Sequence, residues 1–312
     1  MKFKVFSKIR FFFLIYSVMI FSACHDSDKI EPEYGERTVL IYMAADNNLN
    51  KDGETNIKSI LKGMEQTAGR LVIYIDRRYD VPRLLTVKGG KGCRLDTLET
   101  YTEENSASPE VLARVVKEVQ KRYPASSYGL VLWSHGLGWV PPEYSFPGGY
   151  AMRLPDPDMP RTKYYAEDEH PGTTGKAYMD IREMAARLPG HFSFILWDVC
   201  FMGGIEVAYE LRNKTDYMIA SPAEVISDGF PYEKMMPLLW GGEEAMKQIC
   251  REYYNHYNKY QVNSLWRSAV VGLVKTEELE PLVAKVRTLL AGKTDYVRAW
   301  HYPLSKGGLP MV

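Results

Sequence analysis

The sequence predicts an α/β protein with a mainly parallel central sheet covered by helices on both faces, a three-layer arrangement. Strand and helix signals alternate from about residue 37 onward. The predicted strands are short, continuous apolar runs, as expected of strands buried on both faces. Hydrophobic residues make up 46% of the 312 residues and charged residues 25%, which excludes collagen-like, disordered and disulfide-dense chains.

The first predicted elements form a strand–helix–strand pattern. Thr38–Ala44 (TVLIYMA) is an apolar run suited to a buried strand. The polar residues 46–48 end this strand and start a helix over 49–64. Leu71–Ile75 (LVIYI) is a second strand, and Arg83–Val87 is a third that ends before two glycines.

The alternation continues to the end of the chain. Residues 109–122 have apolar positions at helical spacing, and 129–133 (GLVLW) is a strand that ends at Ser-His-Gly. A short helix over 180–188 precedes the apolar strand 192–197 (FSFILW), and a helix over 204–211 follows it. The last predicted elements are strand 217–220, helix 243–257, strand 269–274 and helix 277–290. No closing element follows, so we expect the C-terminus to be incomplete.

Residues 137–176 interrupt the pattern. They hold seven prolines and several acids, and the stretch is too long for a connection in a compact domain. Such loops are usually functional or disordered.

The N-terminus predicts export. Residues 1–23 carry four basic residues among the first ten and continue with an apolar run and small residues, which is typical of a signal peptide. The apolar run is shorter than the roughly 20 residues that a membrane span needs, so a retained anchor is the weaker alternative. Cys24 then follows small residues as in a bacterial lipobox, which implies lipidation and a flexible tether over 24–36. A free cysteine beside an ordinary cleavage site is the alternative.

Charge and cysteine usage narrow the function further. The chain holds 39 basic and 39 acidic residues, so nothing favours nucleic-acid binding. Residues 1–23 contain basic but no acidic residues, so the chain without them has a net negative charge. Cys93, Cys200 and Cys250 show no zinc-binding spacing. We expect Cys93 and Cys250 to be buried thiols, with a disulfide between them as the alternative.

Three chemically capable residues follow predicted strands. Asp46, His135 and Cys200 each lie just beyond a carboxyl end, where open α/β sheets bind ligands. A thiol beside an imidazole or a helix N-terminus can become a nucleophile. Gly136 allows close approach of the backbone, so its N–H can stabilise an oxyanion. Taken singly, a buried structural cysteine or histidine is the simpler reading.

Four segments of the chain resemble the clostripain family of cysteine peptidases, which shares a clan with caspases, gingipains and legumain. They are TVLIYMAADNNLN, VLWSHGLGW, ILWDVCFMGGIEVAYEL and YMIASPAEVISDGFPY, between about residues 38 and 232. The order of strand-His-Gly and then strand-Asp-x-Cys carries the resemblance. The Q-A-C-x-G motif of caspases is absent from the sequence. The resemblance implies a caspase-like fold for one peptidase domain over residues 37–312.

The resemblance also implies roles for individual residues. Cys200 would be the nucleophile and His135 its partner, as a proton-transfer group or by polarising the scissile amide. The N–H groups of Gly136 and Cys200 would form the oxyanion hole. The family cleaves after Arg or Lys, and Asp198 and Asp228 match the acids of its S1 pocket. A capping role is the alternative for Asp198, and a turn-forming Asp-Gly the alternative for Asp228. We expect Asp46 to support the site structurally, with a direct role as the alternative.

Two further expectations concern the loop over 137–176. Family members often cut this loop themselves, which predicts self-cleavage between about residues 150 and 176; an uncut surface loop is the alternative. The candidate sites are Arg153, Arg161, Lys163 and Lys176. We expect no required cofactor and no metal site. The acids over 156–169 are expected to be solvated, with calcium binding as the alternative, although the EF-hand pattern is not met.

The sequence thus predicts an exported cysteine endopeptidase, lipid-anchored to the bacterial outer membrane or cell surface. Its expected partners are the membrane and protein or peptide substrates with Arg or Lys at the cleaved position. The alternative is a catalytically silent surface lipoprotein that uses the same fold to bind a partner. The short C-terminus supports that alternative, as do Pro222 and Ala223, which stand where family members commonly carry other residues. No G-x-S-x-G or H-E-x-x-H motif supports a serine or zinc hydrolase.

Overall fold

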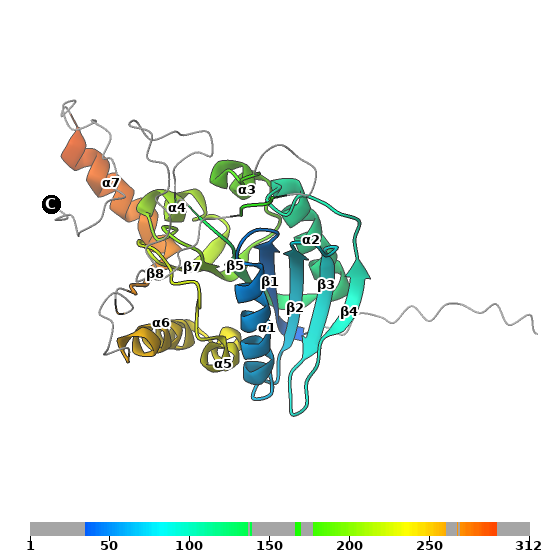
Figure 1. Ribbon diagram of the computed structural model, residues 1–312. Coiled ribbons are helices and arrows are strands. Elements are labelled where there is room, and N and C mark those ends of the chain that lie inside the picture. Colours follow the sequence, from blue (N-terminus) through cyan, green and yellow to red (C-terminus); the bar gives the residue numbers. More distant parts are fainter. Residues whose placement is uncertain are drawn as a thin grey trace, which may run out of the picture. The chain divides into compact units, whose positions relative to one another are not determined.

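A computed structural model describes residues 35–136, 138, 166–169, 177–259, 267 and 269–291. Eight strands form one sheet in the order β4-β3-β2-β1-β5-β6-β7-β8 (Figure 1). The strands are β1 (Gly35–Ala45), β2 (Arg70–Arg77), β3 (Arg83–Lys88), β4 (Asp96–Thr100), β5 (Ala125–Trp133), β6 (Phe192–Asp198), β7 (Thr215–Ala220) and β8 (Gly272–Lys275). The predicted signal peptide, residues 24–34 of the tether, the four candidate cleavage sites and the predicted incomplete C-terminus lie outside the described residues. The last two residues of the predicted tether, Gly35 and Glu36, belong to β1 instead.

The strands at the centre of the sheet are parallel. β2, β1, β5, β6 and β7 run in one direction, whereas β3, β4 and β8 pair antiparallel at the two edges. The mainly parallel sheet predicted from the apolar runs is therefore confirmed. All five parallel strands end at the same edge of the sheet, and this edge carries the candidate site.

Helices cover both faces. The elements are α1 (Asn50–Met64), α2 (Pro109–Arg122), α3 (Ile181–Arg187), α4 (Ile205–Glu210), α5 (Tyr232–Met235), η1 (Met236–Trp240), α6 (Glu243–Asn258), η3 (Thr276–Glu278) and α7 (Leu279–Leu290). One core layer holds buried residues of α2, α3 and α4, and the other holds buried residues of α1, α5, η1 and α6 (Figure 1). The predicted three layers are thus present.

Alternate side chains of β1 pack into the two core layers. Leu40 and Tyr42 pack in the layer with α2, whereas Val39, Ile41 and Met43 pack in the layer with α1. Successive side chains of a strand point to opposite faces, so a strand covered on both sides must be apolar throughout. Residues 38–45 of β1 are all buried, which accounts for the continuous apolar run in the sequence.

Several elements differ from the prediction. β4 (DTLET) was not predicted because it is a polar edge strand with no buried residue. α5 and η1 were not predicted because prolines precede and interrupt them. The polar residues 46–48 end β1, and the predicted helix follows them as α1, although no side chain caps its N-terminus. These side chains make other contacts, described below.

The described cysteines are all free thiols, so the alternative of a Cys93–Cys250 disulfide is not realised. Cys93 and Cys250 are half-buried rather than buried. The Cys93 thiol donates a hydrogen bond to the carbonyl of Leu61. Within the described ranges, no helix combines the length and the apolar character that crossing a bilayer requires.

Candidate active site

His135 and Cys200 occupy equivalent places at the ends of neighbouring strands. β5 and β6 are parallel, and their register pairs Trp133 with Asp198. His135 lies two residues beyond Trp133, and Cys200 lies two residues beyond Asp198. The fold therefore brings the two predicted catalytic residues to one edge of the sheet.

His135 is buried and held from the end of β1. Its Nε2 atom lies 2.6 Å from Oδ1 of Asn48, and the side chain is 2% exposed. An amide oxygen can only accept a hydrogen bond, so this contact places the ring proton on Nε2 and leaves Nδ1 unprotonated in the neutral imidazole. The neighbouring Ser134 hydroxyl donates to the carbonyl of Ala44 at 2.7 Å, which ties the end of β5 to the end of β1.

The contact between His135 and Asn48 lies at the switch point of the sheet. From β1 the chain leads to β2 on one side, and later returns through β5, β6 and β7 on the other side. Connections diverge at such a point and leave a crevice between strand ends, where α/β proteins bind ligands. Gly136, the predicted oxyanion residue, is buried here.

Cys200 is buried against the segment that follows β7. Its side chain is 0% exposed, and its Sγ atom accepts a hydrogen bond from the N–H of Val225 at 3.2 Å. A backbone donor stabilises a thiolate more than a thiol. Further backbone bonds run from Phe201 N–H to the carbonyl of Ala223 at 2.9 Å and from Gly203 N–H to that of Ser221 at 2.8 Å. Residues 221–225 thus form one wall of the site.

The loops after β5 and β6 touch each other at Gly138 and Phe201. Both have a left-handed backbone, with φ of 69° at Gly138 and 61° at Phe201. A Cβ atom built on Gly138 would lie 2.7 Å from the carbonyl oxygen of Phe201, so only glycine fits there. The left-handed conformation costs Phe201 about 1–2 kcal/mol. The residue after the candidate nucleophile is therefore held in an uncommon backbone conformation.

Asp198, one predicted S1 residue, lies buried at the end of β6. Its Oδ2 atom accepts a hydrogen bond from the Tyr232 hydroxyl at 2.9 Å and one from the N–H of Phe230 at 3.4 Å. Burial, reinforced by the nearby carboxylate, raises the pKa of Tyr232 well above its usual value, so the hydroxyl remains a donor. The alternative role as a helix cap is wrong, because α4 begins only after Gly204 and has no side-chain cap.

Asp228, the second predicted S1 residue, is exposed in the turn before Phe230. Gly229, at φ 72°, donates its N–H to the carbonyl of Ile226 at 2.8 Å, so Asp-Gly does form a turn. The carbonyl of Asp228 accepts from Nδ2 of Asn56 at 2.9 Å, and Oδ1 of Asn56 accepts from the Trp133 indole at 2.7 Å. The Asp198 side chain thus contacts the short segment 228–232, and Asp228 is the first residue of that segment.

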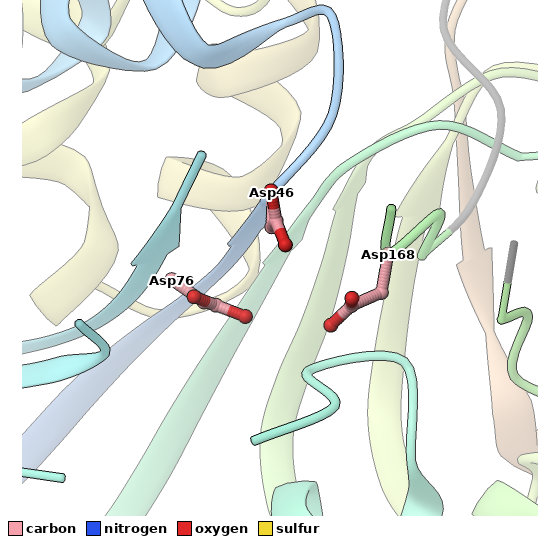
Figure 2. Close-up of side chains that lie close together, drawn as sticks. All are labelled: Asp46, Asp76 and Asp168. Atoms are coloured by element: carbon pink, nitrogen blue, oxygen red, sulfur yellow. The ribbon is translucent and has the colours of Figure 1, made fainter. Parts of the chain in front are cut away.

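Three buried aspartates meet beside this site. Asp46 follows β1, Asp76 belongs to β2, and Asp168 comes from the segment 166–169; one carboxylate oxygen of each lies within 4.8 Å of the others (Figure 2). The N–H of Glu169 donates to the carbonyl of Asp46 at 2.8 Å, and Nδ2 of Asn47 donates to that of Glu167 at 2.7 Å. The expected solvated acidic loop is therefore wrong for Glu167 and Asp168, which are buried.

The sequence reasoning did not single out Asn48, Asp76 or Val225. Asn48 belongs to the same polar run as Asp46, and its place beyond a strand end was a usable signal. Asp76 directly follows the apolar run of β2, where a carboxylate is unusual in a buried strand. Val225 takes part through its backbone, which side-chain patterns do not reveal.

Comparisons with known proteins agree with this geometry. The sequence profile described as "Clostripain family" matches residues 41–298. Clostripain from Hathewaya histolytica is 26% identical over 237 residues, which cover 66% of this chain and 42% of the relative. The chain thus spans about two fifths of the length of that curated relative.

Two solved structures are similar over most of the chain. A secreted C11 cysteine protease from Bacteroides thetaiotaomicron, in complex with an irreversible peptide inhibitor, is 32% identical with a TM-score of 0.69 and covers 83% of this chain and 71% of its own. An inactive zymogen C11 protease from Parabacteroides distasonis is 36% identical with a TM-score of 0.68 and covers 84% of this chain and 68% of its own. The central sheet therefore has the architecture of C11 proteases.

Proposed function

Since this chain belongs to the clostripain family of cysteine peptidases, we propose that it is a cysteine endopeptidase that cleaves after Arg or Lys. The observation that carries the proposal is the β5–β6 register, which sets His135 and Cys200 at equivalent places on one sheet edge. A nucleophile and a proton-transfer group at the carboxyl ends of neighbouring strands are the minimum for thiol-dependent acyl transfer.

In the proposed reaction the Cys200 thiolate attacks the scissile carbonyl and forms a thioester. The imidazole of His135 transfers a proton to the leaving amine, and water then hydrolyses the thioester and releases the free thiol. The N–H groups of Gly136 and Cys200 stabilise the oxyanion. Asn48 keeps the ring proton on Nε2, so that Nδ1 exchanges protons with the reacting groups.

The proposed Arg/Lys specificity depends on Asp198 and Asp228. A guanidinium or ammonium group entering a pocket needs an opposite charge there. An ion pair that is shielded from water has a stronger electrostatic attraction than an exposed pair. Asp198 supplies a buried carboxylate at the end of β6, and Asp228 an exposed one on the adjoining turn. The relative bound to a peptide inhibitor supports a peptide-binding cleft in this fold.

Fluorogenic peptides test the proposal. Purified protein is incubated with peptides that end in Arg, Lys or Leu before the fluorophore, with and without a thiol alkylator. We expect turnover of the Arg or Lys peptides only, and its loss on alkylation or in Cys200→Ala. No turnover by the wild type would favour the alternative of a silent partner-binding lipoprotein. Turnover by Cys200→Ala would exclude the assigned nucleophile.

We also propose that the protein activates itself by cutting the loop between residues 150 and 176. Cys200 is fully buried against residues 221–225, as expected of a site that must open before substrate enters. A relative was solved as an inactive zymogen. Wild-type protein should split on storage into two fragments, with the new N-terminus after Arg153, Arg161, Lys163 or Lys176, while Cys200→Ala stays whole. Equal processing of both proteins would exclude self-cleavage.

For localisation we propose export and anchoring through a lipid on Cys24. The B. thetaiotaomicron relative is a secreted protein, which supports export. The lipid is tested by mass spectrometry of the membrane fraction of a bacterial host, where Cys24→Ser should lose the acyl mass and appear in the soluble fraction. Equal membrane retention of both proteins would count against the lipid anchor.

A further inference from the structure

We propose that the hydroxyl of Tyr253, on α6, is a further binding group of the S1 pocket, where it accepts a hydrogen bond from the substrate's guanidinium or ammonium group beside Asp198. This role rests on the proposed cleavage after Arg or Lys. The Tyr253 side chain is 0% exposed. It packs against the segment 228–232, which the Asp198 side chain also contacts.

The packing of Tyr253 places its ring beside the turn that holds Asp198. The ring lies 4.4 Å from that of Phe230, between centroids, and 5.1 Å from that of Tyr257. Phe230 donates its N–H to Asp198 at 3.4 Å, and the Tyr257 hydroxyl donates to the carbonyl of Gly229 at 2.5 Å. Both neighbours of the Tyr253 ring therefore belong to this turn or bind it.

The Tyr253 hydroxyl also lies near the reacting groups. Burial raises the pKa of Tyr253, and Asp198 and Cys200, when ionised, raise it further. Electrostatic effects weaken with distance, so both groups lie close to the hydroxyl. With a raised pKa the phenol stays protonated at neutral pH, and it can donate one hydrogen bond and accept others. Helix α6 thus presents a neutral hydroxyl to the region of the candidate nucleophile and the proposed S1 acid.

The hydroxyl of Tyr253 is buried and makes no hydrogen bond with any residue in the described part of the chain. Burial of an unpaired hydroxyl is costly, so such groups are rare in folded proteins. The two tyrosines around it differ in this respect, because Tyr232 donates to Asp198 and Tyr257 donates to Gly229. We infer that the partner of the Tyr253 hydroxyl arrives with the substrate.

The proposed substrate has the chemistry to supply this partner. A guanidinium group carries five N–H donors in one plane, and an ammonium group carries three. Asp198 neutralises the charge, while Tyr253 accepts an N–H that the carboxylate leaves over. The planar guanidinium spans two acceptors more readily than the compact ammonium does. The hydroxyl should therefore favour Arg over Lys.

Tyr253→Phe tests the role, because it removes only the oxygen and keeps the ring. Its kcat/KM for Arg peptides should fall about tenfold or more, and less for Lys peptides, so the Arg/Lys ratio falls. Its Tm should equal or exceed that of the wild type, since a buried unpaired group is lost. Tyr254→Phe, at a 56% exposed position on the same helix, should match the wild type in all three values. Tyr257→Phe, which loses an existing hydrogen bond, should lower the Tm by about 2 °C or more.

Agmatine, a small guanidinium compound, measures the pocket without catalysis. In isothermal titration it should bind Tyr253→Phe about tenfold more weakly than the wild type. If this difference is seen but no peptide is cleaved, the proposed peptidase function fails and the binding role of Tyr253 stands. If peptides are cleaved but both proteins have equal kcat/KM and equal agmatine affinity, the role of Tyr253 is overturned and the proposed function stands.

Two further outcomes would also overturn the role of Tyr253. One is the absence of agmatine binding by the wild type. The other is a changed rate of Cys200 alkylation by iodoacetamide in Tyr253→Phe together with an unchanged agmatine affinity. That result would assign the hydroxyl to the thiolate instead of the substrate.

Discussion

Asn48 and His135 meet across the ends of two neighbouring parallel strands, with the amide oxygen 2.6 Å from Nε2 of the imidazole. In many catalytic sites a histidine is oriented by a group on its second nitrogen, and loss of that group reduces activity without removing the chemistry. Asn48 fills this place in a polar run whose other members hold the segment 166–169.

Replacement of Asn48 by Ala should lower kcat about tenfold with little change in KM, because the ring loses the acceptor that fixes its tautomer. Steady-state kinetics on Arg and Lys peptides measure both constants. Thr55→Ala, at an exposed position on α1, is the control. A rise in KM at constant kcat would show that Asn48 binds substrate instead.

Gly138→Ala should impair both stability and activity, because the new methyl group meets the carbonyl of Phe201. Gly92 provides a matched control: it also has a left-handed backbone, with φ of 74°, but a Cβ built there meets nothing within 4 Å. Gly92→Ala should cost only the backbone term of about 1 kcal/mol. Chemical denaturation of both variants should show a larger loss for Gly138→Ala, and equal losses would mean that the two loops adjust freely.

Neutralisation of the two proposed S1 acids should separate their roles. Asp198→Asn still accepts from Tyr232, so its Tm should change little while kcat/KM for Arg and Lys peptides falls by about a hundredfold or more. Asp228→Asn should have a smaller effect on kcat/KM, because the exposed charge is screened by solvent. Unchanged kcat/KM in both variants would place the S1 charge elsewhere.

Acid should destabilise the protein partly through His256 on α6. Burial, together with Lys259 and Lys234, lowers the pKa of His256, although Asp228 opposes this. The unfolded state then binds more protons between the folded pKa and about 6.5, so stability falls as the pH drops through this window. Thermal melts from pH 7 to pH 5 should show a smaller decrease in Tm for His256→Gln than for wild type. A larger decrease in the variant would contradict the assignment.

Much of the fold was predictable because strands that are buried on both faces of the sheet have continuous apolar sequences. The apolar runs of β1, β2, β5 and β6 predict strands that are covered by helices. Pro109 and the serine before it indicate the start of α2. β4 escaped because an exposed edge strand has no apolar requirement. The short helices after Pro231 were not predicted, because tertiary packing rather than helix propensity stabilises them.

The sequence predicts those site residues whose location depends only on their position at the end of a strand. His135 and Cys200 follow strands, so parallel pairing brings them together. The partnership of Asp76 with Asp168, which are far apart in sequence, depends on how the segment 166–169 returns to the sheet. The wall beside Cys200 depends on the backbone of Val225, and no side-chain pattern encodes it.

The adjacency of β5 and β6 has a consequence for any processed form of the protein. The strands pair from Gly129 with Phe194 to Trp133 with Asp198, and the loop over 137–176 connects them in sequence. A cut in that loop therefore leaves two polypeptides that share one sheet and both core layers. Unfolding then becomes a dissociation, so the Tm should rise with protein concentration, and reassembly after denaturation should be bimolecular and slow.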